Sequence, residues 1–310
     1  MISFYKTINT KTVEIDLPEE GCWVSVVAPT EKEIDFLLTE MKLDSGFVKS
    51  SLDEEETSRI ENEEDQTLMI IDLSQMQPNP TKNDTILYST TPVGIIITPA
   101  HVVTIALHDN PVLNEMANGS VKGINTNLKT RFVLLFLLRV AARYLQMLRQ
   151  IDRISENVEK QLHLSMKNKE LIQMLGLEKS LVYFSTSLKS NEMTLEKILR
   201  GRVIKLYEDD QELLEDVLIE IRQAIQMSDI YTNILSGTMD AFASVISNNL
   251  NIVMKVLTSI TILLTVPTLI SSFYGMNVEG IPLPNFWIIA GISVLITLGA
   301  AVWLRIKKML

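Results

Sequence analysis

The chain has 310 residues, of which 46% are hydrophobic, and a formal net charge of -10 at pH 7. This charge argues against a nucleic-acid partner, because binding to phosphates requires a concentrated basic surface. The single cysteine, Cys22, excludes an internal disulfide and fits a reducing compartment. The sequence contains no P-loop, nucleophile elbow or metal-hydrolase motif, so we do not expect an enzyme.

Residues 1–125 mix short β-rich runs with helices and are expected to form an α/β domain in the cytoplasm. A helix is expected to begin at Thr30, which forms a capping-box pattern with Glu33 ahead of an apolar run. A second, weaker helix is expected in the residues upstream of Glu61. The expected strands cover residues 12–16, 22–27, 67–73, 85–89, 94–98 and 102–107.

Residues 126–250 are expected to form a stalk of long helices. Two helices are predicted at residues 131–166 and 168–199, and a third begins at Glu208 and meets no proline before Pro267. At a rise of 1.5 Å per residue, this third helix would be on the order of 100 Å long. A helix of that length has little to pack against in its own chain, so we expect the protein to self-associate around an axis.

Two uncharged apolar stretches, Val256 to Phe273 and Ile281 to Leu304, lie near the C-terminus. Each approaches the roughly 20 residues that cross a bilayer as a helix. We therefore expect a membrane hairpin. Its expected parts are a first transmembrane helix at 251–274, an external loop at 275–285, a second transmembrane helix at 286–304 and a basic tail at 305–310.

Positive charges flank this hairpin on one side only. Lys255 precedes the first span, and Arg305, Lys307 and Lys308 follow the second. Because positive residues concentrate in cytoplasmic segments, we expect both termini in the cytoplasm and the protein in the cytoplasmic membrane. The connecting loop would then face outwards with Glu279 as its acidic residue.

The hairpin carries Tyr274-Gly275-Met276-Asn277 between its two spans, and an Asn-x-x-Met-Lys-x-Leu-Thr run starts at Asn251. These residues resemble the CorA family of divalent-cation channels, in which a Gly-Met-Asn motif closes the first of two C-terminal spans. The resemblance implies a funnel-shaped homopentamer with an α/β cytoplasmic domain, long helices and two C-terminal transmembrane helices. It also implies passive entry of Mg²⁺, with Co²⁺ and Ni²⁺ as further candidate ions, and no organic cofactor.

The same resemblance assigns a selectivity filter to Gly275, Met276 and Asn277. The assignment suits the ion, because Mg²⁺ gives up water reluctantly and neutral carbonyl oxygens can contact its hydration shell. Gly275 would let the backbone turn at the helix end, and the Asn277 side-chain carbonyl, repeated by symmetry, would make a ring of acceptors. The alternative interpretation is a simple helix cap and turn between two spans.

Further pore positions are implied along the same helix. Leu257 would form a hydrophobic constriction, and Asp240 would place a carboxylate near the inner mouth. Thr265 stands where many relatives have methionine, which is a departure from the family pattern. The implied pore-lining residues are Asp240, Asn248, Asn251, Leu257 and Thr268.

A regulatory divalent-cation site is implied between Asp53 and Asp216 of neighbouring subunits. A cation there would screen the repulsion between the carboxylates, hold the subunits together and favour the closed pore. The acidic residues Glu54 to Glu56 compete with Asp53 for this role. The plain alternative is that the acidic run is a solvated surface.

Two other functions remain open from the sequence. Zinc transport on the same scaffold is one, because the loop Val278 to Leu283 is closer to the branch called ZntB. No Cys or His near the pore supports a zinc ligand set, however, since His101, His108 and His163 lie far upstream. The other is a membrane-anchored sensor or scaffold. Polar residues within the first span argue against a mere tether, namely Thr258, Thr261, Thr265, Thr268 and Ser271.

Overall fold

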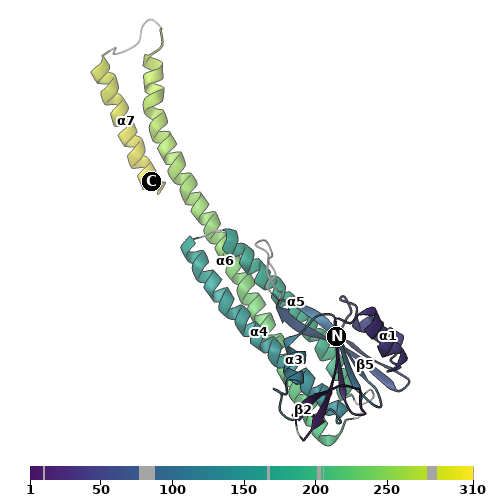
Figure 1. The fold of residues 1–310 in the computed structure, drawn as a ribbon. Coiled ribbons are helices and arrows are strands. Elements are labelled where there is room, and N and C mark those ends of the chain that lie inside the picture. Colours follow the sequence, from purple (N-terminus) through teal and green to yellow (C-terminus); the bar gives the residue numbers. More distant parts are fainter. Residues whose placement is uncertain are drawn as a thin grey trace. The chain divides into compact units, whose positions relative to one another are not determined.

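The computed structural model describes residues 1–9, 11–76, 88–165, 168–200, 204, 206–277 and 285–309 (Figure 1). It separates into two compact units, Met1–Thr238 and Met239–Leu310, and each unit is described by itself. The boundary falls within the longest helix. The expected architecture is confirmed: an α/β domain is followed by long helices and two candidate transmembrane helices.

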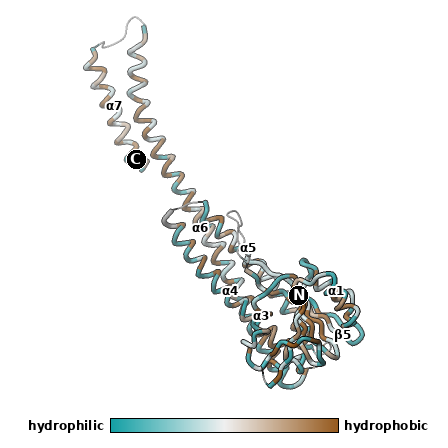
Figure 2. Tube along the Cα trace, in the orientation of Figure 1, coloured by the Kyte–Doolittle hydropathy of each residue, from teal (hydrophilic) through white to brown (hydrophobic). Residues whose placement is uncertain are grey.

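A seven-stranded sheet forms the centre of the α/β domain, in the order β2-β1-β3-β7-β6-β5-β4. Neighbouring strands are antiparallel except β3 and β7, which are parallel. Strands β3, β7, β6 and β5 are rich in buried apolar residues, which is typical of a sheet covered on both faces, and this part of the sheet is brown in Figure 2. The strands are β1 (Ile2–Ile8), β2 (Lys11–Ile15), β3 (Trp23–Val27), β4 (Arg59–Glu63), β5 (Gln66–Met76), β6 (Tyr88–Ile97) and β7 (Val102–Ala106).

Short helices cover one face of this sheet. Leu37 of α1 (Glu31–Thr39) and Phe47 of α2 (Ser45–Ser51) share a buried cluster with Val24 and Val26 of β3. The predicted start of α1 is confirmed, because the Thr30 N–H donates to the Glu33 carboxylate at 2.8 Å. A third short helix, α3 (Pro111–Ala117), was not predicted.

The long helices cover the other face. Trp23 of β3 stacks on Phe132 of α4 (Lys129–Ser165), with ring centroids 5.2 Å apart. Tyr88 of β6 meets Phe184 of α5 (Asn168–Leu199) at 6.1 Å. Successive residues of a strand point to opposite faces, so β3 serves both layers: Val24 and Val26 face the short helices, and Trp23 faces α4.

Two strands differ from the sequence-based expectation. β1, which lies between β2 and β3, was not predicted, and its side chains are half-buried. Glu61 lies within strand β4, and the helix upstream of it is α2. β4 is an edge strand with exposed charged side chains, as is typical of a protected edge. Of the expected strand at 85–89, residues 85–87 lie outside the described residues.

Asn191 of α5 takes the place of a strand partner where β4 ends. β4 pairs with β5 as far as Arg59 opposite Ile70, and Asp72 lies two residues further along β5. The Asp72 N–H donates to Asn191 Oδ1 at 3.0 Å, and Asn191 Nδ2 donates to the Asp72 carbonyl at 2.9 Å. Tyr144 of α4 donates to the same carbonyl at 3.0 Å. These bonds fasten both long helices to the sheet.

The first part of α6 (Glu208–Tyr274) packs along α5 within unit 1. Ser228 Oγ donates to the Leu181 carbonyl at 3.0 Å, and the Arg222 guanidinium donates to the Glu192 and Glu196 carboxylates at 2.6 and 2.8 Å. The long helices predicted from residue 131 onwards are present, and their bounds differ from the predicted ones by only a few residues.

Unit 2 is a helical hairpin formed by the rest of α6 and by α7 (Phe286–Ile306). The buried Ser259 Oγ lies 2.9 Å from the Met309 carbonyl, so the end of α7 lies beside residues 255–259 of α6. Both helices are long and apolar enough to span a membrane, and almost none of their apolar stretches is buried within the chain. Such exposed apolar surface requires lipid or other copies of the chain to cover it.

Candidate functional site

The membrane segment of α6 has three faces, which follow from the rotation of about 100° per residue in an α-helix. The first face packs towards α7 and is buried or half-buried at Ser259, Ile262, Leu263, Val266 and Ile270. The second is apolar and exposed at Val253, Leu257, Ile260 and Leu264.

The third face carries a row of exposed hydroxyl groups. We call this row the hydroxyl seam; its residues alternate in steps of three and four, so they line one face of the helix. By helical rotation, the seam lies nearly opposite the face that packs towards α7. The seam consists of Thr258, Thr261, Thr265, Thr268 and Ser272.

The same spacing continues from the seam towards the start of unit 2. All members of this continuation are exposed and, apart from Met254, all are polar. A row of polar side chains in an otherwise apolar span indicates a face that does not contact lipid. The continuation consists of Met254, Asn251, Ser247, Ser244 and Asp240.

The predicted pore positions divide between the seam face and its two flanks. Asp240, Asn251 and Thr268 lie in register with the seam. Asn248 and Leu257 are each one residue out of register, on opposite sides of it. The hydroxyl residue at the end of the seam nearest Gly275 is Ser272, whereas Ser271, one residue before it, is out of register. The spacing of three and four along the sequence is the signal that would have identified Ser272.

The Gly275-Met276-Asn277 motif follows the end of α6 at Tyr274. The Gly275 N–H still donates to the Ser271 carbonyl at 3.0 Å, and the φ of Gly275 is not in the left-handed region. The turn after α6 therefore does not use a left-handed glycine. An added Cβ would lie 3.3 Å from the Ser271 carbonyl oxygen, which is a tight contact. Asn277 is exposed, and Glu279 lies outside the described residues.

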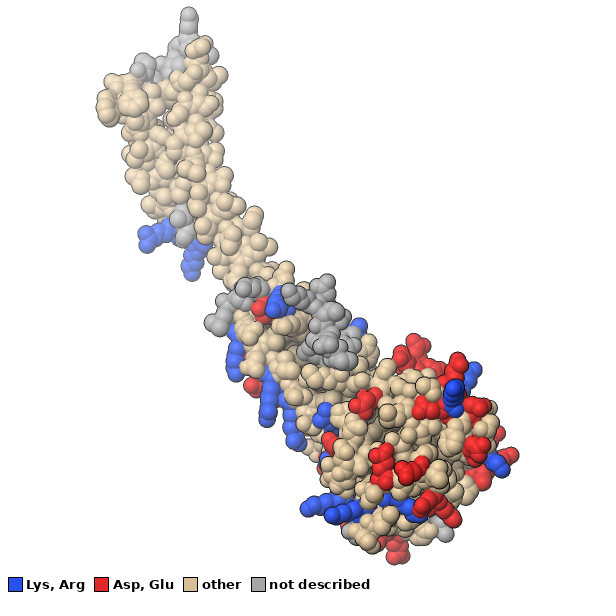
Figure 3. Space-filling view, viewed as in Figure 1, with Lys and Arg blue, Asp and Glu red and all other residues tan. Residues whose placement is uncertain are grey.

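All four positive residues of unit 2 gather at one end of its hairpin. The contact between Ser259 and Met309 brings Lys255 near Arg305, Lys307 and Lys308, which are all exposed. Figure 3 shows blue Lys and Arg side chains at one end of the hairpin. The hairpin therefore has one basic end and one end without positive charge.

The two predicted regulatory carboxylates are both exposed. Asp53 follows α2, and its Oδ1 accepts the Glu55 N–H at 3.0 Å. Two of its competitors are engaged within the chain: Glu56 with Arg59, and Glu54 with His108 at 3.4 Å. Asp216 projects from α6. Within the described residues of one chain, no three His, Cys, Asp or Glu side chains gather as a metal site.

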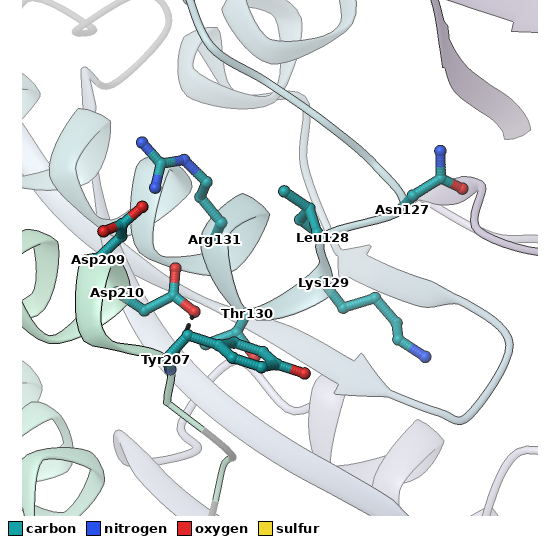
Figure 4. A pocket seen from close by; sticks show the side chains of 8 residues that line it. All are labelled: Asn127, Leu128, Lys129, Thr130, Arg131, Tyr207, Asp209 and Asp210. Atoms are coloured by element: carbon teal, nitrogen blue, oxygen red, sulfur yellow. Dashed lines mark hydrogen bonds between the residues drawn. The ribbon is translucent and has the colours of Figure 1, made fainter.

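A pocket of about 390 Å³ lies in unit 1 between the starts of α4 and α6 (Figure 4). Its polar side chains are held by their own chain. Lys129 Nζ donates to the Thr98 carbonyl at 3.0 Å, and the buried Asp210 carboxylate accepts the Tyr207 N–H at 3.4 Å. Lys129 and Asp210 therefore have partners within the chain.

The cysteine and two histidines are placed in the α/β domain. Cys22 is fully buried, and its Sγ lies 3.3 Å from Nδ1 of His101. Burial raises the pKa of the Cys22 thiol and lowers the pKa of His101, so both groups favour their neutral forms. His108 is an exposed partner of Glu54, and the side chain of His163 lies outside the described residues.

The fold and the hairpin define a class of membrane protein, in which an α/β domain is joined by long helices to a polar-faced span. The family model described as "CorA-like Mg2+ transporter protein" matches residues 18–308, so the chain belongs to this family. The resemblance found in the sequence is thereby confirmed. Members of the family are ion transporters and not enzymes.

Individual relatives agree with this placement. The chain is 28% identical over 284 residues to the "Cobalt/magnesium transport protein CorA" of Methanocaldococcus jannaschii, covering 88% of this chain and 86% of the relative. The complete structure of the CorA magnesium transporter from that organism superposes with a TM-score of 0.84 at 24% identity, covering 98% and 97% of the two chains. The cytoplasmic domain of ZntB from Vibrio parahaemolyticus gives a TM-score of 0.60 at 11% identity, covering 80% and 97%. These two structures show likeness of fold.

Proposed function

We propose that the chain forms a homo-oligomeric channel through which Mg²⁺ enters the cell passively across the cytoplasmic membrane. The observation that carries the proposal is the hydroxyl seam on the face of α6 turned away from α7. A repeated row of polar side chains on one face of a span is typical of a face turned towards water or protein, and a pore shared by several copies would give these groups water. The five-fold arrangement is taken from the family resemblance.

The proposed path begins outside at Gly275, Met276 and Asn277 and continues along the seam. Neutral oxygens suit an ion that keeps its water shell, and Asn277 offers a side-chain carbonyl at the mouth. Asn251 and Asp240 would contact the ion further inwards, and Glu279 would lie in the external loop. Asn248 and Leu257 would border this path from either side.

The charge distribution of the hairpin supports the proposed orientation. Its basic end would lie in the cytoplasm, because membrane proteins retain Lys and Arg on that side. Residues 251–274 and 286–304 would then cross the membrane, 275–285 would face outwards, and 305–310 would form the basic inner tail. The domain of residues 1–125 and the stalk of 126–250 would also be cytoplasmic.

Intracellular Mg²⁺ would regulate the pore through Asp53 and Asp216 of adjacent subunits. Two carboxylates about 4 Å apart repel each other by about 1 to 4 kcal/mol, and a bound cation reverses this term. Asp53 suits this role better than Glu54 and Glu56, which are engaged with His108 and Arg59. Loss of the ion would separate the subunits and open the pore.

Ion uptake into proteoliposomes tests the proposed filter. The full chain should admit Mg²⁺ without nucleotide, and Asn277→Ala should reduce uptake by about tenfold, the loss expected for one hydrogen bond to a charged hydrated ion. Undiminished uptake by Asn277→Ala would refute the filter. Uptake of Zn²⁺ but not Mg²⁺ would move the function to zinc transport, and no uptake of either ion would favour a membrane-anchored scaffold.

The regulatory site has a separate test. Asp216→Lys replaces one carboxylate by a cation that repels Mg²⁺, so the variant should keep conducting at internal Mg²⁺ concentrations that close the wild type. Glu215→Lys is the matched control, because it reverses the charge of the exposed neighbouring residue on α6 outside the proposed pair. Unchanged inhibition in Asp216→Lys would exclude this residue from the sensor.

A further inference from the structure

Three threonines of the hydroxyl seam donate their hydroxyl protons to backbone carbonyls of their own helix. Oγ1 of Thr261 donates to the Leu257 carbonyl at 2.9 Å, and Oγ1 of Thr265 donates to the Thr261 carbonyl at 2.7 Å. Thr268 donates to the Leu264 carbonyl at 2.8 Å. This back-bonding to the residue four positions earlier is a known alternative for threonine within helices.

The hydrogen bonds determine what the seam presents to its surroundings. A hydroxyl group has one proton and two acceptor lone pairs. Because the protons of Thr261, Thr265 and Thr268 point into their helix, only acceptor capacity remains for a partner. An acceptor row attracts cations and the outward-pointing protons of their water shells, whereas an anion would need donors.

The other faces of the hairpin lack this property. Leu257, Ile260 and Leu264 present hydrocarbon, and their exposed fractions of 56%, 47% and 67% suit contact with lipid or with another copy. Thr297 of α7 makes the same bond, to the Ser293 carbonyl at 2.8 Å, but Thr297 and Ser293 are half-buried, and no further hydroxyl group follows at this spacing among the described residues of α7. The seam therefore differs from a chance threonine by its repetition on one exposed face.

We propose that Thr261 and Thr265 are positioning residues that hold the water shell of the divalent ion, so that the outer half of the path is a wet, cation-selective lining and not an apolar gate. This inference rests on the proposed function, since it needs an ion path along α6. It gives a role to Thr265 despite its departure from the family pattern.

Cysteine accessibility tests whether the seam is wet, independently of transport. Thr265→Cys and Leu264→Cys place thiols on adjacent residues of different faces, and the buried Cys22 keeps the background low. A thiol reacts as its thiolate, which forms in water but not in lipid. In full-length chain reconstituted in liposomes, a charged methanethiosulfonate reagent should modify Thr265→Cys at least tenfold faster than Leu264→Cys. Equal rates would overturn the inference, whatever the transport result.

Flux measurements test the role of the oxygen atoms. Thr261→Val and Thr265→Val replace a hydroxyl by a methyl group of similar size, and each should lower Mg²⁺ uptake about tenfold, the loss of one hydrogen bond to a charged group. Thr265→Ser should restore uptake, and Thr297→Val should leave it unchanged. Wild-type rates in both seam valine variants would overturn the proposed role, as would an equal loss in Thr297→Val. If the wild type admits no Mg²⁺ but Thr265→Cys is labelled, the proposed function fails while the wet seam remains.

Discussion

Replacing Asn191 by alanine should destabilise the α/β domain strongly, because one side chain closes the edge of β5. The change removes the acceptor of the Asp72 N–H and one of two donors to the Asp72 carbonyl. It also removes the acceptor of the Ser58 hydroxyl, 2.8 Å away. Asn191 is only 1% exposed, so water has little access to the groups that lose their partner.

The size of the effect follows from these contacts. A buried polar group left without a partner costs about 1 to 3 kcal/mol, and the Asp72 carbonyl keeps its bond from Tyr144. We therefore expect a loss of about 2 to 4 kcal/mol for Asn191→Ala. For a folded unit of about 240 residues each kcal/mol lowers the Tm by about 2 to 4 °C, so the Tm should fall by roughly 5 to 15 °C.

Calorimetric unfolding of the detergent-solubilised full chain would measure this fall. Ser190→Ala is the control, because the neighbouring Ser190 makes one long bond of 3.4 Å to the Ser58 carbonyl and its loss should cost less than about 1 kcal/mol. A Tm of Asn191→Ala within about 2 °C of the wild type would refute the claim that this side chain replaces a strand partner.

Two further changes in the α/β domain have defined outcomes. Gly94→Ala would place a Cβ 1.8 Å from Ser51 Oγ and 2.4 Å from its Cβ, so a loss of about 1 to 3 kcal/mol is expected. Adding Ser51→Gly should recover most of the Tm, and a double variant no more stable than Gly94→Ala would contradict this contact. Burial raises the pKa of the Asp72 carboxyl, so the folded state holds that proton more tightly than the unfolded chain does. The stability of the folded state therefore falls as the pH rises from the ordinary pKa of Asp through the raised pKa of Asp72. Asp72→Asn should be more stable than the wild type at neutral pH, and this advantage should disappear near about pH 4. An advantage that does not change with pH in unfolding experiments would exclude the carboxyl as its cause.

Much of the fold follows from local patterns in the sequence. Helix α6 was predicted nearly to its ends, because an apolar period without proline before Pro267 leaves little alternative. Strands β1 and β4 were missed because their partly exposed side chains give no clear alternation. Local patterns could not reveal the Asn191 contact, because its partner Asp72 lies 119 positions away in the chain.

The site was predictable as a set of residues but not as a surface. The motif at Gly275 and the threonines of the first span are visible in the sequence. The face opposite α7 becomes evident only when the packing of Ser259 is known. That packing shows that Thr268 lies on the seam face, whereas Asn248 and Leu257 are each one residue out of its register.

The measurement that most directly tests passive Mg²⁺ conduction is uptake by proteoliposomes at imposed membrane potentials, without nucleotide and without a proton gradient. The account predicts that the initial rate rises steadily as the interior becomes more negative, because a divalent cation gains about 4.6 kcal/mol per 100 mV. It also predicts that Thr297→Val follows the wild type and that Asn277→Ala does not. Uptake that is insensitive to potential, or that requires a proton gradient, would contradict the account.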